Sequence, residues 1–215
     1  MTDRTATRPQ GRRYSGQDAT ERTRQRRAAL LAAALELFAH QGYPSTSVKQ
    51  ICRQAGLTER YFYESFRDRH ACLVALYTEL AEQMRAVTTA AIADAEDRSA
   101  EDVVRSALAA FVDYLTTDAR RARVVLLEVV GASAELEQRR HAVLADFAEL
   151  TTAVWVQLAE RAGPTDAQRL AAIGLVGAVN HLLVDWLHRG QRETPAELVD
   201  TCSTLFTAVR NHLES

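Results

Sequence analysis

The sequence predicts an all-α protein of about nine helices, with a short N-terminal domain of three helices and a larger C-terminal helical domain. Three observations predict this fold. Apolar residues recur at helical spacing in successive segments, and no segment alternates apolar and polar residues as a strand does. Capping residues precede several of these segments, so the helix boundaries are also marked.

The first two helices are marked by their apolar residues and by the residues that end them. In Ala28–His40, apolar residues recur at the spacing of one buried helix face, and Gly42 ends the segment. Ser47 and Gln50 have the form of a capping box at the start of a second, two-turn helix, which ends at Gly56.

The third helix and those that follow have comparable signals. Thr58 is placed to cap a short helix that runs through Tyr63, and Phe62 faces back toward the core; Asp68 can cap a fourth helix. Two later helices begin with capping boxes at Thr165 and Thr194. The expected helices of the C-terminal part are Leu73–Ala93, Glu101–Thr116, Ala119–Val130, Ala134–Arg161, Asp166–Arg189 and Pro195–Leu213.

The charge is distributed unevenly along the chain. The whole chain of 215 residues has a formal charge of only −2, which by itself argues against a nucleic-acid partner. Residues 1–70, however, hold 13 Lys and Arg against 7 Asp and Glu, whereas residues 71–215 hold 13 against 21. This asymmetry favours an anionic partner at the N-terminal end.

No targeting segment is expected. Residues 1–19 contain no apolar run, so the sequence predicts neither a signal peptide nor a membrane anchor, and we expect a cytoplasmic protein without a membrane partner. The longest apolar stretch, Leu170 to Val179, is interrupted by Asn180 and His181 and is too short to cross a bilayer. We therefore expect it to be a buried helix.

The residues that bind metals or form disulfides do not form a recognisable site. Cys52, Cys72 and Cys202 are odd in number and lack C-x-x-C spacing, which indicates neither a disulfide framework nor a zinc site. His181, Asp185 and His188 share a helix face, but one helix seldom supplies a complete metal site. We expect no metal, no cofactor and no catalytic residues, since no nucleophile–base pair or phosphate-binding glycine loop is present.

The second and third helices have the features of a helix-turn-helix motif, in which the second helix of the pair enters the DNA major groove. Gly56 supplies the tight turn, and polar residues occupy the outward face. An ordinary helical hairpin is the alternative, but it does not account for that polar face or for the flanking arginines. The residues expected at the helix crossing are Ile51, Cys52, Ala55, Leu57 and Phe62, and the flanking arginines are Arg12, Arg13, Arg22, Arg24, Arg26 and Arg27.

The segment from Ser47 to Thr58, continued by Tyr63, Phe66 and Leu73, resembles the signature of the tetracycline-repressor (TetR) family of bacterial transcriptional regulators. The motif covers residues 25–77, and over the rest of the chain the resemblance is one of architecture. It implies a DNA-binding domain over residues 20–67 and a ligand-binding and dimerisation domain over 68–215. It also implies a palindromic double-stranded DNA operator and an unknown small-molecule effector. Residues 1–19 are rich in Thr, Arg, Gly and Gln and cannot bury enough apolar surface to fold, so we expect them to form a disordered basic arm.

The resemblance assigns DNA contacts to the second and third helices and their flanks. Arg60, Ser65 and His70 depart from the family pattern, where glycine, histidine and an acidic residue are frequent, so the operator sequence cannot be inherited from a relative. The implied DNA-binding residues are Thr46, Ser47, Lys49, Thr58, Glu59, Arg60, Tyr61, Tyr63, Ser65 and Arg69.

Residue chemistry suggests a role for some of these contacts. Arg60 suits bidentate recognition of guanine. Glu59 suits either cytosine N4 or a purely electrostatic role at the helix N-terminus. Lys49, Tyr63 and Arg69 suit phosphate. For Arg12 and Arg13, minor-groove contact and solvated disorder are both open.

The C-terminal domain is expected to provide a twofold interface and an effector site. In the resembled family the last two helices form a four-helix dimer bundle, although their apolar stripes equally fit a monomer core. The expected interface residues are Gly174, Gly177, Ala178, Leu198, Cys202, Leu205 and Val209. The pool for the effector site, each also consistent with simple core, is Phe111, Tyr114, Phe147, Trp155, Asn180, His181 and Trp186.

The sequence therefore predicts a homodimeric, ligand-responsive DNA-binding regulator, with repression relieved by an inducer as the expected mode. The alternative is a helical small-molecule-binding or catalytic dimer whose DNA-binding motif is vestigial. Regulation by activation has the same sequence signature as repression.

Overall fold

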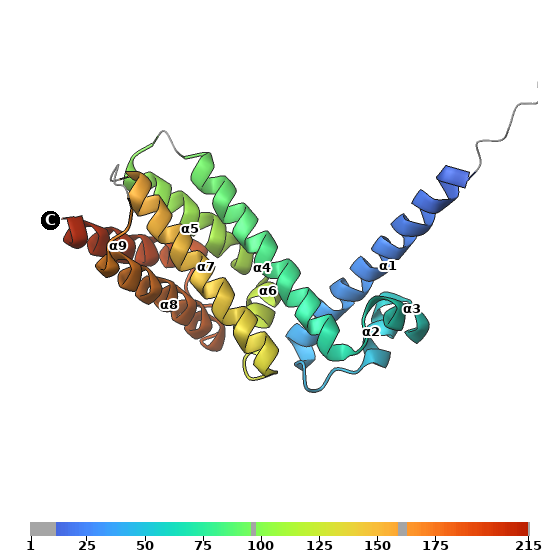
Figure 1. Ribbon diagram of the computed structural model, residues 1–215. Helices are drawn as coiled ribbons and strands as arrows, with labels where there is room; N and C mark the ends of the chain where they lie inside the picture. Colours follow the sequence, from blue (N-terminus) through green and yellow to red (C-terminus); the bar gives the residue numbers. More distant parts are fainter. Residues whose placement is uncertain (1–11, 96–97, 159–162, 215) are drawn as a thin grey trace, which may run out of the picture.

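The computed structural model of the protein describes residues 12–95, 98–158 and 163–214. These residues form nine α-helices and one π-helical segment and contain no strand, which confirms the predicted fold class. The N-terminal helices are α1 (Arg12–Gln41), α2 (Val48–Ala55) and α3 (Glu59–Ser65), and α4 (Arg69–Ala93) leads from them into the body (Figure 1). The body contains α5 (Ala100–Thr116), α6 (Ala119–Arg123), η1 (Val124–Glu128), α7 (Ala134–Leu158), α8 (Asp166–His188) and α9 (Pro195–Glu214).

The caps predicted around α2 are present. The Ser47 side chain accepts from the Gln50 backbone N–H, and the Gln50 side chain accepts from the Ser47 backbone N–H at 2.8 Å. Gly56 ends the helix with φ +66°, a left-handed conformation that favours glycine. Thr58 occupies the N-cap position of α3, but its side chain makes no capping hydrogen bond. The turn geometry of the motif is therefore fixed mainly by α2 and Gly56.

Helix α1 is longer than the apolar pattern predicts. It begins at Arg12, so residues 12–19, expected to belong to a disordered arm, are helical, whereas residues 1–11 lie outside the described residues. Residues 19–27 of this extension are mostly exposed, and they carry pairs such as Glu21 with Arg24, whose closest atoms are 2.7 Å apart.

One predicted helix is two elements. The range Ala119–Val130 divides into the short helix α6 and the π-helix η1, which changes the hydrogen-bond register at Val124. Val124, Val125 and Leu126 are all buried, because η1 lies between α1, α4 and α8. Such single-turn π segments are often found at functional sites, and they cannot be recognised from apolar spacing.

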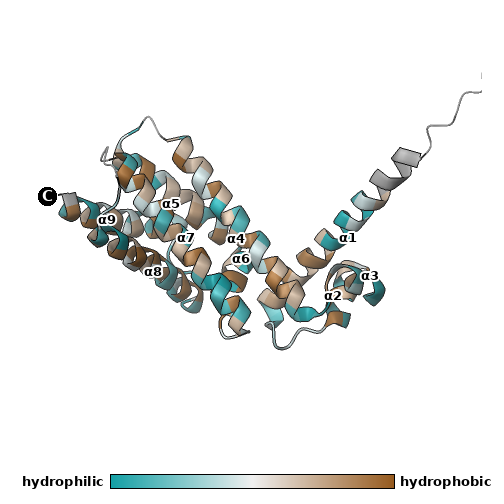
Figure 2. Ribbon diagram, in the orientation of Figure 1, coloured by the Kyte–Doolittle hydropathy of each residue, from teal (hydrophilic) through white to brown (hydrophobic). Residues whose placement is uncertain are grey.

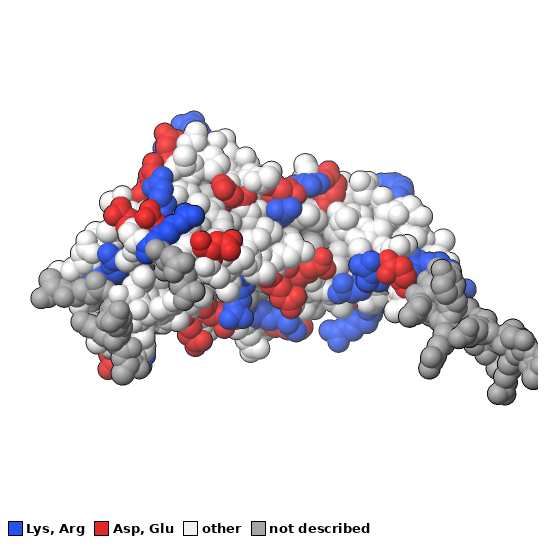
Figure 3. Space-filling view, turned by 90° about the horizontal axis from the view of Figure 1, so that it is seen from above, with Lys and Arg blue, Asp and Glu red and all other residues white. Residues whose placement is uncertain are grey.

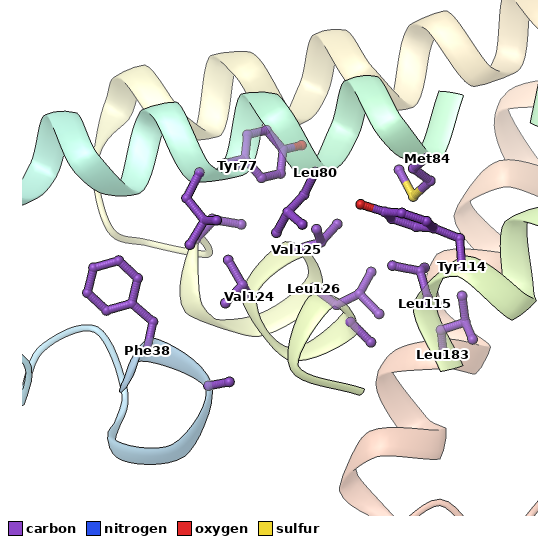
Figure 4. Close-up of a cluster of buried hydrophobic side chains, with 14 of the residues drawn as sticks. Phe38, Tyr77, Leu80, Met84, Tyr114, Leu115, Val124, Val125, Leu126 and Leu183 are labelled. Atoms are coloured by element: carbon purple, nitrogen blue, oxygen red, sulfur yellow. The ribbon is translucent and has the colours of Figure 1, made fainter. Parts of the chain in front are cut away.

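A single apolar core joins the N-terminal helices to the body. Figure 4 shows Val124 of η1 on the side of Phe38 of α1, and Leu126 of η1 on the opposite side, beside Leu115. Leu115 of α5 and Leu183 of α8 extend the same cluster, so η1 contacts both parts of the molecule. A displacement of η1 therefore affects the packing of α1.

Helix α8 is largely exposed rather than buried. It is 23 residues long, and its most apolar window has a mean hydropathy of 1.6, with 28% of that window buried. Length and composition would allow it to cross a bilayer, but these two properties are weak evidence because core helices share them. The expectation of a buried helix is wrong for the single chain, since Leu170 and Ile173 are 70% and 60% exposed on the apolar helix seen in Figure 2.

Candidate nucleic-acid interface and cavity

The outward face of α3 is open to solvent. Thr58, Glu59 and Arg60 are exposed, and Tyr63 is 56% exposed, whereas Phe62 is fully buried and anchors the helix. The Arg60 Nε lies 3.1 Å from Glu64 Oε1 in an exposed pair, which costs little to exchange for another acceptor. Four of the predicted contact residues thus lie together on one accessible surface.

Two arginines of α1 stack on aromatic rings in α3 and at its C-terminal end. The Arg26 guanidinium lies 4.2 Å from the centroid of the half-buried Tyr61 ring, and Arg27 lies 5.3 Å from that of Phe66. Arg27 also lies 3.7 Å from Glu79 of α4. The sequence predicted only that both arginines flank the motif as positive charges, because a stacking contact with an aromatic ring produces no recognisable pattern in the sequence.

Two predicted DNA contacts have structural roles at the start of α2. Thr46 is 1% exposed and its hydroxyl donates to the Gly42 carbonyl at 2.9 Å, so the expectation that its side chain meets DNA is wrong. Arg69 donates from Nη1 to the carbonyls of Pro44 and Thr46, and its guanidinium lies 4.4 Å from the centre of the Tyr43 ring. This side chain braces the loop that leads into α2.

Other predicted residues remain accessible beside this loop. Ser47 and Lys49 are exposed at the start of α2, and Ser65 is partly exposed at the end of α3. In the face shown in Figure 3, mostly basic side chains surround the N-terminal helices, and more acidic ones follow along the body. The charge asymmetry of the sequence is therefore also present along the molecule.

The body contains an apolar cavity of about 100 Å³ lined by residues of α4, α5, α7, α8, α9 and η1. Val125 and Leu126 of η1 form one wall, and Phe111 and Phe147 meet edge to face with ring centres 5.2 Å apart. Most of the lining is aliphatic or aromatic, with Arg140 the charged side chain among the described residues that line it. Such a site fits an apolar small molecule.

The predicted effector residues divide into two groups. Phe111, Phe147 and Asn180 line the cavity. The others do not line this cavity: Tyr114 donates its hydroxyl to Gln83 at 3.0 Å, Trp155 and Trp186 are buried in packing, and His181 is exposed. Periodicity shows which residues are inward-facing, but it does not distinguish cavity wall from filled core, and so it missed Tyr77, Arg140 and η1.

A hydrogen bond connects the cavity wall to the N-terminal helices. Glu128, in the same π-helix as Val125 and Leu126, accepts from the Tyr43 backbone N–H at 2.7 Å. Its side chain is 11% exposed and lies 3.6 Å from Arg123 Nε. Leu126, which lines the cavity, and Glu128, which bonds the α1–α2 loop, are therefore only two positions apart.

A second connection surrounds Arg120. Its guanidinium lies 2.6 Å from Glu36 of α1 and 2.7 Å from Asp118. The hydrogen bond from Arg120 lowers the pKa of Asp118 below its ordinary value. At the start of α4, His70 Nε2 lies 3.3 Å from Glu135 Oε2 of α7 and connects the motif to the body on another side.

The predicted interface residues also divide into two groups. Gly174, Gly177 and Leu205 are exposed, Ala178 and Val209 are half-buried, and a Cβ on either glycine would meet nothing within 4 Å. Leu198 and Cys202, in contrast, are 6% and 1% exposed and pack in the monomer core, which is the alternative that the sequence left open. The exposed apolar surface is therefore mainly the face of α8 that carries Leu170 and Ile173.

The described residues contain no group of three His, Cys, Asp or Glu side chains placed to hold a metal ion. His181 and His188 are exposed, and Asp185 lies 3.4 Å from Arg189. The cysteines are all buried and free, and burial raises the pKa of Cys72 to about 12.

Residues 30–76 match the family model described as bacterial regulatory proteins, tetR family. The FadR regulator of Bacillus subtilis, in complex with stearoyl-CoA, is 22% identical, with a TM-score of 0.69 over 85% of this chain and 96% of its own. FadR of Bacillus halodurans is 18% identical, with a TM-score of 0.72 over 87% and 96% of the two chains. A TetR-like transcriptional regulator of a Rhodococcus species is 20% identical, with a TM-score of 0.66 over 84% and 93%. These structures share the fold over 84–87% of this chain, and residues 30–76 are similar to the N-terminal domain of tetR-family regulatory proteins.

Proposed function

We propose that the protein is a homodimeric transcriptional repressor that binds a palindromic operator and leaves it when an apolar effector enters the cavity of the body. The observation that carries this proposal is the position of η1, which supplies both a wall of the cavity and the carboxylate that holds the α1–α2 loop.

The proposed DNA contacts follow from exposure. Arg60 can exchange its exposed pairing with Glu64 for the O6 and N7 atoms of a guanine in the major groove. Lys49, Ser47 and Tyr63 are accessible for phosphate, where contacts fix the register of the protein on the duplex. Tyr61 supports α3 through its stacking on Arg26.

Dimerisation supplies the second recognition helix. A palindromic operator requires two such helices about one DNA turn or a multiple apart, related by a twofold axis. The exposed apolar face of α8, with Leu170, Ile173 and the open surface at Gly174 and Gly177, is the proposed contact between two copies. Leu205 of α9 extends this face.

Release from DNA is proposed to follow from the size of the cavity. About 100 Å³ is less than the volume of a typical ligand pocket, so a larger effector is proposed to displace the walls, among which Val125 and Leu126 belong to the short π-helix. Displacement of η1 changes the position of Glu128 and with it the Tyr43 loop. An effector that prefers the displaced conformer lowers operator affinity by its difference in affinity for the two conformers. The stearoyl-CoA complex of the Bacillus subtilis FadR supports an effector with a long apolar chain.

A mobility-shift assay with the DNA next to the protein's own gene tests the proposal. We expect a protein-dependent shift at low salt, and we expect Arg60→Ala to weaken it at least about tenfold through loss of a base contact. Arg85→Ala is the matched control, because Arg85 is exposed on α4 about 24 Å along the helix from Arg69 and its loss removes the same charge. Absence of a shift, or equal effects of the two variants, would contradict the proposed DNA-binding surface.

A further inference from the structure

The residues that line the cavity extend along two helices. Its α7 wall runs from Arg140 to Val154 with lining residues every three to four positions, and its α4 wall runs from Tyr77 to Ile92. At 1.5 Å per residue, fourteen positions of α7 correspond to about 21 Å of wall. A small volume distributed over such a length fits a chain-like molecule better than a compact ring system.

The polar groups of the cavity are concentrated in a few side chains. The hydroxyls of Thr88 and Thr151 donate to carbonyls of their own helices, each at 2.9 Å, so their donor hydrogens are already used. Within the described residues the Tyr77 hydroxyl makes no hydrogen bond, although Tyr77 is only 2% exposed. Figure 4 shows this hydroxyl pointing along α4 in the direction of Met84, another lining residue. A hydroxyl that lines the cavity and has no protein partner can donate to a ligand there.

Arg140 lies at the same end of the cavity as Tyr77. Tyr77 and Arg140 both line the cavity, each at the first lining position of its helix. Burial raises the pKa of Tyr77 to about 12; the charge of Arg140 opposes this rise, and that of Glu137 adds to it. The side chain of Arg140 is 29% exposed, so this end of the cavity is close to solvent. Its present partner is Glu137, at 3.3 Å, and Glu137 also accepts from the Gly131 backbone N–H at 2.7 Å.

We propose that Tyr77 and Arg140 form the head-group site for a long-chain amphipathic effector whose polar end carries acceptor oxygens, with the alkyl chain extending along α4 and α7 toward Ile92 and Val154. This inference rests on the proposed effector cavity and names its ligand class. Both side chains are hydrogen-bond donors, and Arg140 is cationic, so the pair selects a carboxylate or acyl carbonyl and rejects an ammonium group.

The same geometry gives the head group a role in regulation. A ligand acceptor that binds the Arg140 guanidinium competes with Glu137 Oε2. The other carboxylate oxygen of Glu137 accepts the hydrogen bond from the Gly131 backbone N–H. Gly131 lies three positions after the end of η1, in a left-handed conformation with φ +71°. Binding of the head group therefore loosens the loop that follows η1, at the same time as the chain displaces Val125 and Leu126.

Isothermal titration of the full-length protein without DNA tests this site with three probes of equal chain length: palmitate, palmitoyl-CoA and hexadecylamine. We expect at least one of the two acyl compounds to bind at least about tenfold more tightly than the amine. Tyr77→Phe should weaken its binding about tenfold through loss of a hydrogen bond to a charged or polarised acceptor. Preference for palmitate assigns the free acid and preference for palmitoyl-CoA assigns the thioester, and either result supports the site.

Matched variants separate the head-group site from general damage. Tyr114→Phe removes a buried hydroxyl that bonds Gln83 outside the cavity, and Arg139→Gln removes the exposed neighbour of Arg140. We expect both to bind the acyl probe as the wild type does, whereas Arg140→Gln behaves like Tyr77→Phe. Equal binding of amine and acyl probes, no detectable acyl binding, or equal effects of Tyr77→Phe and Tyr114→Phe would overturn the inference. Because no DNA is present, these results leave the DNA-binding proposal to its own assay.

Discussion

Replacing Glu128 by alanine removes the hydrogen bond between η1 and the N-terminal helices. The carboxylate accepts from the Tyr43 N–H at 2.7 Å and is 11% exposed, so its loss leaves a partly buried N–H without its partner. Hydrogen bonds to charged groups contribute about 1.5–3 kcal/mol. For a chain of this size, about 2 kcal/mol lowers the Tm by about 4–8 °C, which differential scanning calorimetry measures directly.

The same variant tests whether Glu128 holds the DNA-binding conformer. If the whole of this stabilisation, about 2 kcal/mol, favours the DNA-binding conformer over the other, operator affinity falls by up to about 30-fold in Glu128→Ala. A cavity ligand should then lower the operator affinity of this variant by a smaller factor than that of the wild type. Val103→Ala is the matched control, because Val103 is 3% exposed in a small cluster with Ala95 and Val154, and its truncation destabilises the body alone. If both variants lose stability and keep wild-type operator affinity, the hydrogen bond is only structural and the proposed coupling through η1 is refuted.

Three further predictions concern oligomeric state, acid stability and thiol reactivity. Ile173→Asp places a charge on the exposed face of α8 and should give a monomer in analytical ultracentrifugation. Val87→Asp, which replaces an exposed apolar residue of α4, should leave the protein dimeric. A dimeric Ile173→Asp protein would contradict the proposed interface. Because the pKa of Asp118 is lowered in the folded protein, its carboxylate stabilises the fold above its ordinary pKa of 3.8, and this stabilisation is lost as the pH falls through the lower folded pKa. Between about pH 5 and 3, Asp118→Asn should therefore lose less stability than the wild type in denaturant titrations. Equal losses of stability would contradict this. The thiols of Cys72 and Cys202, whose pKa values burial raises to about 12 and about 11, should react with a thiol reagent at neutral pH only after denaturant is added, and rapid reaction of the native protein contradicts their burial.

The helices of the N-terminal motif were predictable because their signals are local. The capping box at Ser47, the glycine turn at Gly56 and the buried Phe62 each depend on residues within a few positions, and the structure contains all three. The same is true of the capping boxes that begin α8 and α9. Local propensity and capping therefore predicted most of the fold.

The connections between elements were not predictable in this way. The bond from Tyr43 to Glu128 spans 85 positions and that from Arg120 to Glu36 spans 84, and apolar periodicity contains no information about such pairs. The assignment of Thr46 to DNA failed for a related reason, since its burial depends on how the α1–α2 loop folds over Leu37 and Gly42. Likewise, the apolar stripe with Leu198 and Cys202 has the same sequence pattern whether it packs on α5 or on a second copy of the chain, so the pattern does not distinguish the two.

The surface around α3 is proposed to bind operator DNA, and the salt dependence of that binding tests this role most directly. Fluorescence anisotropy with the DNA next to the protein's own gene should give an affinity that falls steeply as salt rises, with a slope of about −0.9 per phosphate contact. Arg60→Ala should weaken binding to this DNA much more than binding to a scrambled duplex. An affinity that is independent of salt, or equal for the two duplexes in the wild type, would contradict the account and favour a vestigial motif on a small-molecule-binding dimer.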